Sequence, residues 1–192
     1  MIDEKYYSAT KENITESDFW TNKLYNIAYD VVKDRKFPIV IPTYNRPENK
    51  FIQWATSTFT ADENWPIYLV VRESQVEQYE ASEYVKNYDY VHVVGFTDSE
   101  IDDIGKVRKK IVEHFSKTED CVFMFDDDIT GFTYTAPFKR ASGSNISMSV
   151  KPASTARVFA MWQLAMETAM SKRDDLIISN AMIAGFNWMP DF

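Results

Sequence analysis

Cys121-Val122-Phe123-Met124-Phe125-Asp126-Asp127-Asp128 is the stretch that decides how the fold is interpreted, because five apolar residues are followed directly by three carboxylates. An apolar run of this length predicts a buried strand that ends at the aspartates. Two like charges at 4 Å repel by about 1 kcal/mol in water and by about 4 kcal/mol near a protein surface. A bound Mg²⁺ or Mn²⁺, which takes carboxylate oxygens together with substrate phosphates, relieves that repulsion most simply. The alternative is an exposed acidic turn, in which aspartates are common.

Apolar runs and helical periodicities alternate around this stretch. The predicted strands are residues 37–42, 67–71, 91–94 and 121–125, and the predicted helices between them are residues 47–59, 74–84 and 103–116. Most strands are continuous apolar runs, which is typical of parallel strands covered on both faces. We therefore expect an α/β fold, with a Rossmann-like, mostly parallel sheet flanked by helices.

The two ends of the chain fall outside this alternation. Residues 17–33 follow a polar arm and have the period of an amphipathic helix. Its predicted apolar face contains Trp20, Leu24, Ile27, Ala28 and Val31. Residues 130–152 are rich in Ser, Thr, Gly and Asn without a clear period, which indicates a functional loop or an irregular hairpin. A helix over 153–171 and a strand over 176–179 are predicted to follow.

Composition excludes several classes of protein. The net charge of -8 argues against a general nucleic-acid-coating role, although a local basic groove remains compatible with it. Cys121 is the only cysteine, which excludes a disulfide framework and a cysteine-based zinc site. No apolar stretch approaches the length of a membrane span, and the polar N-terminus is unlike a secretory signal. These features predict a soluble, cytoplasmic protein.

Polar side chains gather where the predicted strands end. In open α/β sheets, ligands bind outside the carboxyl ends of the strands. These ends carry Thr43-Tyr44-Asn45-Arg46, Arg72-Glu73, Gly95-Phe96-Thr97-Asp98 and Asp126-Asp127-Asp128. One edge of the sheet is thus predicted to hold a phosphate-pairing arginine, an aromatic ring and a metal-binding cluster.

The three aspartates are predicted to differ in role. Side chains alternate along an extended segment, so Asp126 and Asp128 should share one face and reach a common metal, whereas Asp127 points the other way and accepts hydrogen bonds. Arg46 precedes Pro47 at a helix start and is suited to a phosphate or a ribose. A surface pair between Arg46 and Glu48 is its alternative.

Two further side chains could serve the same edge. Tyr44 is suited to stacking on a nucleobase, with a half-exposed packing ring as the alternative. Arg108 borders the buried face of its predicted helix and can reach back toward the strand ends. Pairing of Arg108 with Asp103 or Glu113 is the alternative. The chain lacks a P-loop, a Gly-x-Ser-x-Gly elbow and a dinucleotide glycine fingerprint, which excludes P-loop kinases, α/β-hydrolases and dehydrogenases.

Taken together, these motifs resemble the GT-A fold of nucleotide-sugar glycosyltransferases. The likeness rests on the first strand and loop at 37–47, on Gly105-Lys106-Val107-Arg108 at the place of a Gly-x-x-x-Arg helix, and on 122–128 as an apolar strand with a DXD motif. Related nucleotidyltransferases usually have a glycine-rich loop after the first strand, and residues 43–47 contain no glycine.

A narrower likeness is to the TET/JBP-associated glycosyltransferases, many of them encoded by bacteriophages. It is carried by 38–46, by Tyr68-Leu69-Val70-Val71 with Gln75 and Tyr79, and by the aspartate triplet. Some members are thought to glycosylate hydroxylated pyrimidines in DNA. The resemblance implies such a base as acceptor, with a glycan or a small molecule as the alternative.

The resemblance also implies a division of labour. Asp126 and Asp128 would bind Mn²⁺ or Mg²⁺, and Asp127 would contact the donor, most simply a UDP-sugar. The remaining donor-binding residues would be Thr43, Tyr44, Arg46, Arg72, Glu73 and Arg108. The implied acceptor-side residues are Phe132, Tyr134, Phe138, Lys139 and Arg140, and an ordinary hairpin with exposed cations is the alternative.

The resemblance leaves the catalytic base open. Inverting GT-A enzymes usually place an acid well after the DXD motif. The late acids here are Glu167, Asp174, Asp175 and Asp191, and Asp191 is the candidate. A retaining reaction, or a non-catalytic nucleotide-binding or interaction module, is the alternative.

We expect one domain over 1–192. It would comprise an arm and helix at 1–36, a nucleotide-sugar-binding core at 37–130 and an acceptor side at 131–192, with a fold that continues beyond the last residue or a tail that packs back on it.

Overall fold

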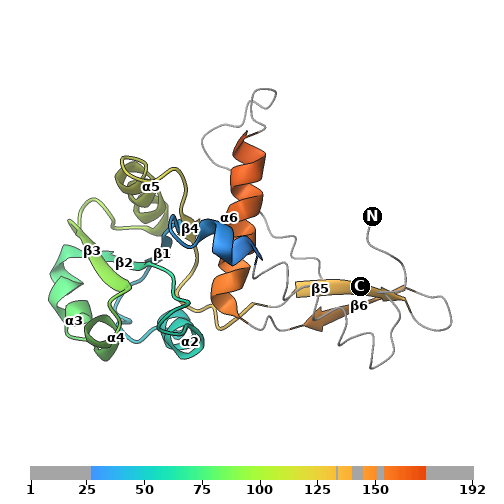
Figure 1. The fold of residues 1–192 in the computed structure, drawn as a ribbon. Coiled ribbons are helices and arrows are strands. Elements are labelled where there is room, and N and C mark those ends of the chain that lie inside the picture. Colours follow the sequence, from blue (N-terminus) through green and yellow to red (C-terminus); the bar gives the residue numbers. More distant parts are fainter. Residues whose placement is uncertain (1–26, 133, 140–144, 151–153, 172–192) are drawn as a thin grey trace.

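The computed structural model describes residues 27–132, 134–139, 145–150 and 154–171. Within these residues, four strands form one parallel sheet in the order β3-β2-β1-β4 (Figure 1). The strands are β1 (Ile39–Pro42), β2 (Ile67–Arg72), β3 (Val91–Phe96) and β4 (Phe123–Met124). The helices are α2 (Lys50–Thr58), the 3-10 turn η2 (Glu73–Gln75), α3 (Val76–Glu80), α4 (Glu83–Asn87), α5 (Ile104–Phe115) and α6 (Thr155–Ser171). The predicted α/β fold with a parallel sheet flanked by helices is confirmed.

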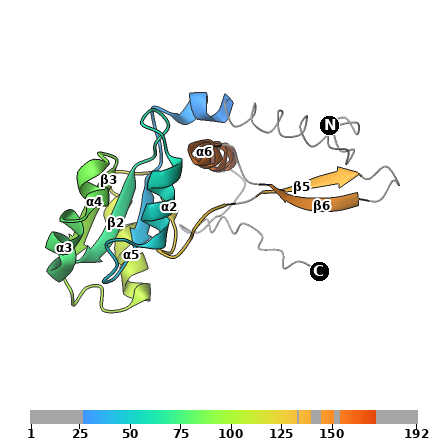
Figure 2. The same ribbon diagram turned by 90° about the horizontal axis from the view of Figure 1, so that it is seen from below.

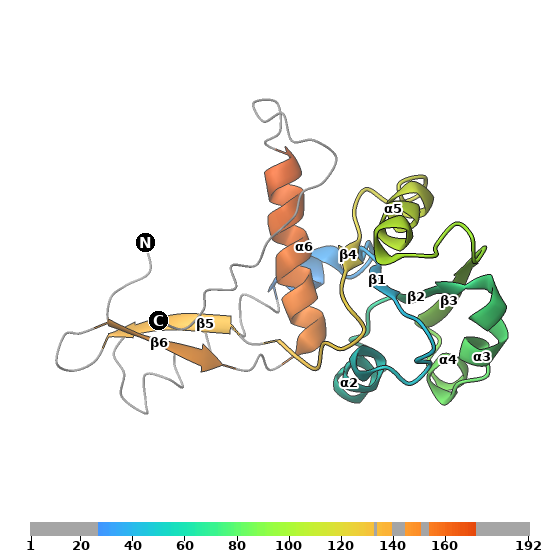
Figure 3. The same ribbon diagram turned by 180° about the vertical axis from the view of Figure 1, so that it is seen from behind.

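Both faces of the sheet are covered, as its apolar strands require. Ile39 and Ile41 of β1 belong to a core cluster that includes residues of α2, α3 and α6. Val40, between them, belongs to a second cluster with Ile111 and Phe115 of α5. Figures 1 and 3 show α5 on one side of the sheet and α2 on the other. Because every residue of β1 is buried, its sequence is uniformly apolar rather than alternating.

The strand order reverses beside β1. The chain runs from β1 outward to β2 and β3, then returns to place β4 on the other side of β1. The helices α2 and α5, which connect these strands, lie on opposite faces of the sheet, and β1 and β4 are neighbours at the point of reversal. Such a switch point is where open α/β sheets bind ligands.

Several predicted boundaries are corrected by local hydrogen bonds. Helix α2 begins at Lys50 rather than at residue 47, because the Asn49 side chain accepts a hydrogen bond from the Ile52 amide and caps it. The predicted helix 74–84 is divided, since Ser82 caps α4 by accepting from the Val85 amide. Strand β4 has two residues instead of five, and the chain enters a turn at Asp127.

The helix predicted over 17–33 is described only from residue 27, and residues 27–32 are helical. Its buried face is turned from the predicted one. Ala28, Tyr29 and Val32 are buried, whereas Ile27 and Val31 are 52% and 46% exposed. The apolar stripe is displaced because Tyr29 packs inward and donates its hydroxyl proton to the Asp62 carbonyl.

Residues 130–152 contain a regular antiparallel hairpin, β5 (Tyr134–Lys139) and β6 (Asn145–Val150), rather than an irregular one. Figure 2 shows α6 between this hairpin and the sheet. The predicted helix 153–171 is confirmed as α6, and the predicted strand 176–179 lies outside the described residues. In the described part of the chain, no helix has the length and apolarity needed to cross a membrane.

Candidate functional site

The loops after β1 and β4 meet at the carboxyl edge, as the sequence predicts. Thr43, directly after β1, donates its hydroxyl proton to Asp127 Oδ2 at 2.8 Å. Arg46 Nη1 donates to the other oxygen of the same carboxylate at 3.0 Å. The Asp127 carbonyl accepts the Phe51 amide proton at 3.1 Å, which adds the first turn of α2 to the junction. Residues more than 80 positions apart in the chain therefore form one connected edge.

The three aspartates differ in exposure in the predicted sense, although not through the predicted strand alternation. The Asp127 side chain is 13% exposed, whereas that of Asp126 is 62% exposed and Asp128 is exposed as well. Asp127 and Asp128 lie in a turn rather than in extended chain. Both oxygens of Asp127 already accept hydrogen bonds from Thr43 and Arg46. Asp127 therefore serves the protein's own loops in this structure, and the outward carboxylates are Asp126 and Asp128.

Arg108 reaches the end of β4 from helix α5. Its Nη2 donates to Asp126 Oδ1 at 2.8 Å, with both side chains about half exposed at 51% and 62%. An exposed pair of this kind contributes about 1 kcal/mol or less, so a phosphate can displace or share it at small cost. The geometry thus brings Arg108 to the strand end as predicted, instead of to Asp103 or Glu113.

An aromatic ring and a third arginine lie along the same edge. The Arg72 guanidinium lies 4.5 Å from the centroid of the Tyr44 ring, and Arg72 Nη2 donates to the Asp102 carbonyl at 3.3 Å. Tyr44 is 53% exposed, so its ring remains open to a planar ligand. Glu73, the next predicted donor contact, is exposed and has no side-chain partner among the described residues.

The loop after β1 is held from beneath by η2 and α3. Asn45 has a φ of 55°, a left-handed conformation that is uncommon outside glycine. The buried Gln75 side chain stabilises it, since its Oε1 accepts the Asn45 amide proton and its Nε2 donates to Asn45 Oδ1. Tyr79, one helical turn further, accepts the Arg46 amide proton at 2.8 Å. The sequence analysis named Gln75 and Tyr79 only as part of the narrower likeness and gave them no site role, although their spacing of four brings both to one side of the η2–α3 segment.

Helix α3 can lie close to the sheet because of one glycine. A Cβ on Gly95, in β3, would lie 2.5 Å from a Val76 methyl carbon, a distance that real contacts do not adopt. The absence of a side chain there lets α3 approach the carboxyl end of the sheet. That approach brings Gln75 and Tyr79 within reach of the β1 loop.

The carboxylates of β4 suit a metal that is shared with a ligand. No group of three or more His, Cys, Asp or Glu side chains that could hold a metal occurs among the described residues. The part of the chain that the structure describes would therefore supply the two outward carboxylates of Asp126 and Asp128. Mg²⁺ is commonly held in this way, by one or two carboxylates with substrate phosphates and water completing the shell. The residues present fit a hard divalent cation bound together with a diphosphate.

Other predicted residues lie elsewhere. Phe132, predicted to face an acceptor, instead packs edge-to-face on Trp54 and Trp162, with ring centroids 5.1 and 4.9 Å apart. Glu167 binds Arg35 at 2.6 Å, before β1 at the opposite edge of the sheet. The side chains of Tyr134, Phe138 and Lys139, together with Arg140 and Asp191, lie outside what the structure describes.

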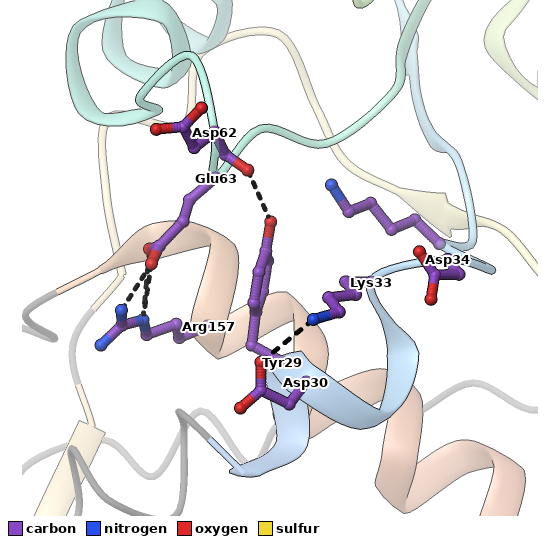
Figure 4. A pocket seen from close by; sticks show the side chains of 8 residues that line it. Tyr29, Asp30, Lys33, Asp34, Asp62, Glu63 and Arg157 are labelled. Atoms are coloured by element: carbon purple, nitrogen blue, oxygen red, sulfur yellow. Dashed lines mark hydrogen bonds and ion pairs between the residues drawn. The ribbon is translucent and has the colours of Figure 1, made fainter.

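A cavity of about 560 Å³ lies at the amino edge of the sheet instead. It is lined by Tyr29, Asp30, Lys33, Asp34, Lys36, Asp62, Glu63 and Arg157, which precede β1 and β2 or lie at the start of α6 (Figure 4). Part of its charge is paired within the protein, as in the Glu63 and Arg157 pair at 2.5 Å and the Asp30 and Lys33 pair at 3.5 Å. Because ligands of open α/β sheets bind at the carboxyl ends, this cavity is not the candidate site.

Comparison with known proteins identifies the family. The family model of the TET-associated glycosyltransferases matches residues 37–179, which include the sheet, the aspartates, the hairpin and α6. Searches of curated proteins and of solved structures returned no match. The narrower of the two predicted likenesses is thereby confirmed, whereas a GT-A DXD role for the aspartates stays a prediction. The chain belongs to the TET-associated glycosyltransferase family.

Proposed function

We propose that the protein transfers a sugar from a nucleotide-diphosphate donor, a UDP-sugar, to an acceptor hydroxyl in a reaction that depends on Mn²⁺ or Mg²⁺. The observation that carries this proposal is the placement of Asp126 and Asp128. Both are outward carboxylates at the switch point, with Arg46 and Arg108 on either side of the triplet. Carboxylates alone would repel a diphosphate, and arginines alone would need no acidic neighbours. The combination fits a metal–diphosphate ligand.

The donor would lie along the carboxyl edge. The base would stack on the exposed Tyr44 ring, with Thr43, Arg72 and Glu73 beside the nucleoside. Arg46 and Arg108 would bind the diphosphate, since guanidinium groups pair with phosphate oxygens in a bidentate manner. Asp126 and Asp128 would hold the metal, which when bound offsets the charge of the leaving diphosphate. Asp127 would keep Thr43 and Arg46 in place. Its effect on the donor would pass through these two residues or be confined to a contact at the edge of the donor.

For the acceptor, we propose a hydroxylated pyrimidine in phage DNA. Support comes from the TET-associated family and from the resemblance that implies such bases. The net charge of -8 favours a local contact with one base over a broad cationic surface. Asp191 is the proposed catalytic base. A glycan or a small molecule with a free hydroxyl is the alternative acceptor.

The test is isothermal titration of the protein with UDP and Mn²⁺. Asp126→Asn/Asp128→Asn keeps side-chain shape but removes both charges, so affinity should fall roughly 100-fold, or by about 2.7 kcal/mol. Asp30→Asn/Asp34→Asn removes two carboxylates at the amino edge and is the matched control. No binding by the intact protein, or equal binding by the two double variants, would sink the proposal. Mn²⁺ without UDP should give little heat, because no third protein ligand occurs in the described part of the site.

A nucleotide-binding module without transfer activity is the second candidate. The observation in its favour concerns Glu167, the one late acid whose side chain the structure describes. It is held by Arg35 and Gln163, and hydrogen bonding from Arg35 keeps the pKa of its carboxyl below the usual value. Release of free UDP from a UDP-sugar, with or without DNA, would rule this candidate out.

A further inference from the structure

Tyr79 has no access to solvent, yet its hydroxyl group lies at the edge of the candidate site. The residue is 0% exposed and belongs to α3. Its oxygen accepts the Arg46 backbone proton at 2.8 Å and lies 3.1 Å from Thr43 Oγ1. Burial, as the largest influence, raises the pKa of this phenol, so it keeps its proton at neutral pH. Tyr79 therefore contacts Thr43 and Arg46, two residues of the loop between β1 and α2, from the protein interior.

The direction of each hydrogen bond follows from the number of protons. The Asp127 carboxylate can only accept, so the single Thr43 hydroxyl proton is donated to Asp127 Oδ2. Thr43 Oγ1 must then accept at its contact with Tyr79, and the Tyr79 hydroxyl is the donor there. The order is thus the Arg46 amide to Tyr79, Tyr79 to Thr43, and Thr43 to Asp127.

The Arg46 side chain closes this series of hydrogen bonds into a ring. Its Nη1 donates to Asp127 Oδ1 at 3.0 Å, while its own amide starts the chain at Tyr79. Both the backbone and the guanidinium of one residue are therefore fixed by one connected set of bonds. Three members, Thr43, Tyr79 and Asp127, are buried or nearly so at 9%, 0% and 13% exposure, and buried connected bonds strengthen one another.

We propose that Tyr79 is a positioning residue that sets the affinity for the donor diphosphate without touching it. It fixes the position of the Arg46 backbone and the orientation of the Thr43 hydroxyl. Through these two groups it also fixes the position of the Arg46 guanidinium. Gln75 holds Asn45 from the same helix face, so the whole loop between β1 and α2 is supported by η2 and α3. This inference rests on the proposed binding of a UDP-sugar at the same edge.

The experiment compares two tyrosine hydroxyls. Tyr79→Phe removes the hydroxyl group at the centre of this ring of hydrogen bonds. Tyr29→Phe removes a single hydrogen bond, from the Tyr29 hydroxyl to the Asp62 carbonyl at the opposite edge of the sheet. In the presence of Mn²⁺, Tyr79→Phe should weaken UDP binding about tenfold at a temperature where circular dichroism shows all variants folded. Tyr29→Phe should lose thermal stability and keep wild-type UDP affinity. A merely structural Tyr79 would behave as Tyr29 does, and that result would overturn the inference.

A double variant provides the second measurement. Thr43→Val cuts the same chain one bond further along, so Tyr79→Phe/Thr43→Val should lose less UDP affinity than the product of the two single losses. If the two losses of UDP affinity multiply, Tyr79 and Thr43 act independently, and this result would contradict the ring of hydrogen bonds. Absence of UDP binding by the wild-type protein would refute the proposed donor and the role of Tyr79 with it. Wild-type binding with an unaffected Tyr79→Phe would refute the role of Tyr79 alone.

Discussion

The two edges of the sheet both carry many charges, but the charges are used differently. At the amino edge, Arg157 pairs with Glu63 and Arg35 pairs with Glu167, and each pair joins α6 to a loop before a strand. At the carboxyl edge, Arg46 and Arg108 meet three aspartates, so one carboxylate is left over. Asp128 has no hydrogen-bond or ion-pair partner among the described residues.

The difference separates charges that hold the fold from charges that await a ligand. Paired ions between distant segments stabilise their arrangement and leave nothing for a substrate to bind. An exposed surplus of negative charge raises the free energy of the folded protein, since like charges repel. A cation relieves that cost when it binds. The cavity of about 560 Å³ lies at the amino edge, so the cavity and the residual charge point to opposite edges here. We regard residual charge at the switch point as the stronger guide to function.

Glu63→Gln removes the ion pair with Arg157 at the amino edge and should have the largest effect on folding. Glu63 accepts bonds from Arg157 and Ser154, at side-chain exposures of 24% and 29% for the ion pair. Losing these charge-assisted bonds should cost about 2 kcal/mol of unfolding free energy, measured by urea denaturation. UDP affinity should not change, because the contacts lie at the opposite edge. A variant with wild-type stability would contradict the role assigned to this edge.

The same residue gives a pH dependence. Burial by itself raises the pKa of the Glu63 carboxyl, but hydrogen bonds from Arg157 and Ser154 and the Arg157 charge outweigh it, so the pKa is lowered from 4.5. A lowered folded-state pKa stabilises the protein above the unfolded value, and that stability is lost as pH falls through the folded value. Wild-type stability should therefore decline below about pH 4.5 more steeply than that of Glu63→Gln.

Much of the carboxyl edge could be predicted from sequence, because apolar runs are local signals. The strand before the triplet and the strand before Thr43 are both continuous apolar stretches, and a parallel sheet brings their ends to one edge. The partners of Asp127 could not be predicted in this way. They depend on the register of β1 against β4 and on the reach of side chains from loops 80 residues apart.

The remaining errors have similar causes. The predicted buried face of the helix at 27–32 was wrong. Ile27 and Val31 continue an apolar pattern in the sequence, whereas Tyr29 turns inward and donates a hydrogen bond to the Asp62 carbonyl. The β5–β6 hairpin was predicted only as an irregular one, although Ile146, Met148 and Val150 alternate with polar residues along β6. Its register pairs Tyr134 with Val150 and Phe138 with Ile146.

Tyr44→Ala, at the carboxyl edge, should have an intermediate effect, on UDP affinity and not on folding. The ring is 53% exposed, so its removal should leave the unfolding free energy nearly unchanged. Loss of a stacking surface should weaken UDP binding about tenfold, or by about 1.4 kcal/mol, while Tyr44→Phe retains most of the affinity. Titration of both variants with UDP and Mn²⁺ checks this. Equal affinity of Tyr44→Ala and wild type would show that the base lies elsewhere.

Tyr90→Phe should have the smallest effect, and in the opposite direction. The Tyr90 hydroxyl, just before β3 at the amino edge, is buried and without a hydrogen-bond partner in the described structure. Removing an unsatisfied buried group should raise the unfolding free energy by about 1 kcal/mol, measured as a shift in the urea midpoint. Burial, with Tyr88 and Asp89 nearby, raises the pKa of Tyr90 from 10.0 to about 12, so the unfolded side chain ionises first and wild-type stability should fall across that window. Tyr90→Phe should lose less stability there. A destabilised variant would contradict this assignment, because it would mean that the Tyr90 hydroxyl has a hydrogen-bond partner in the folded protein.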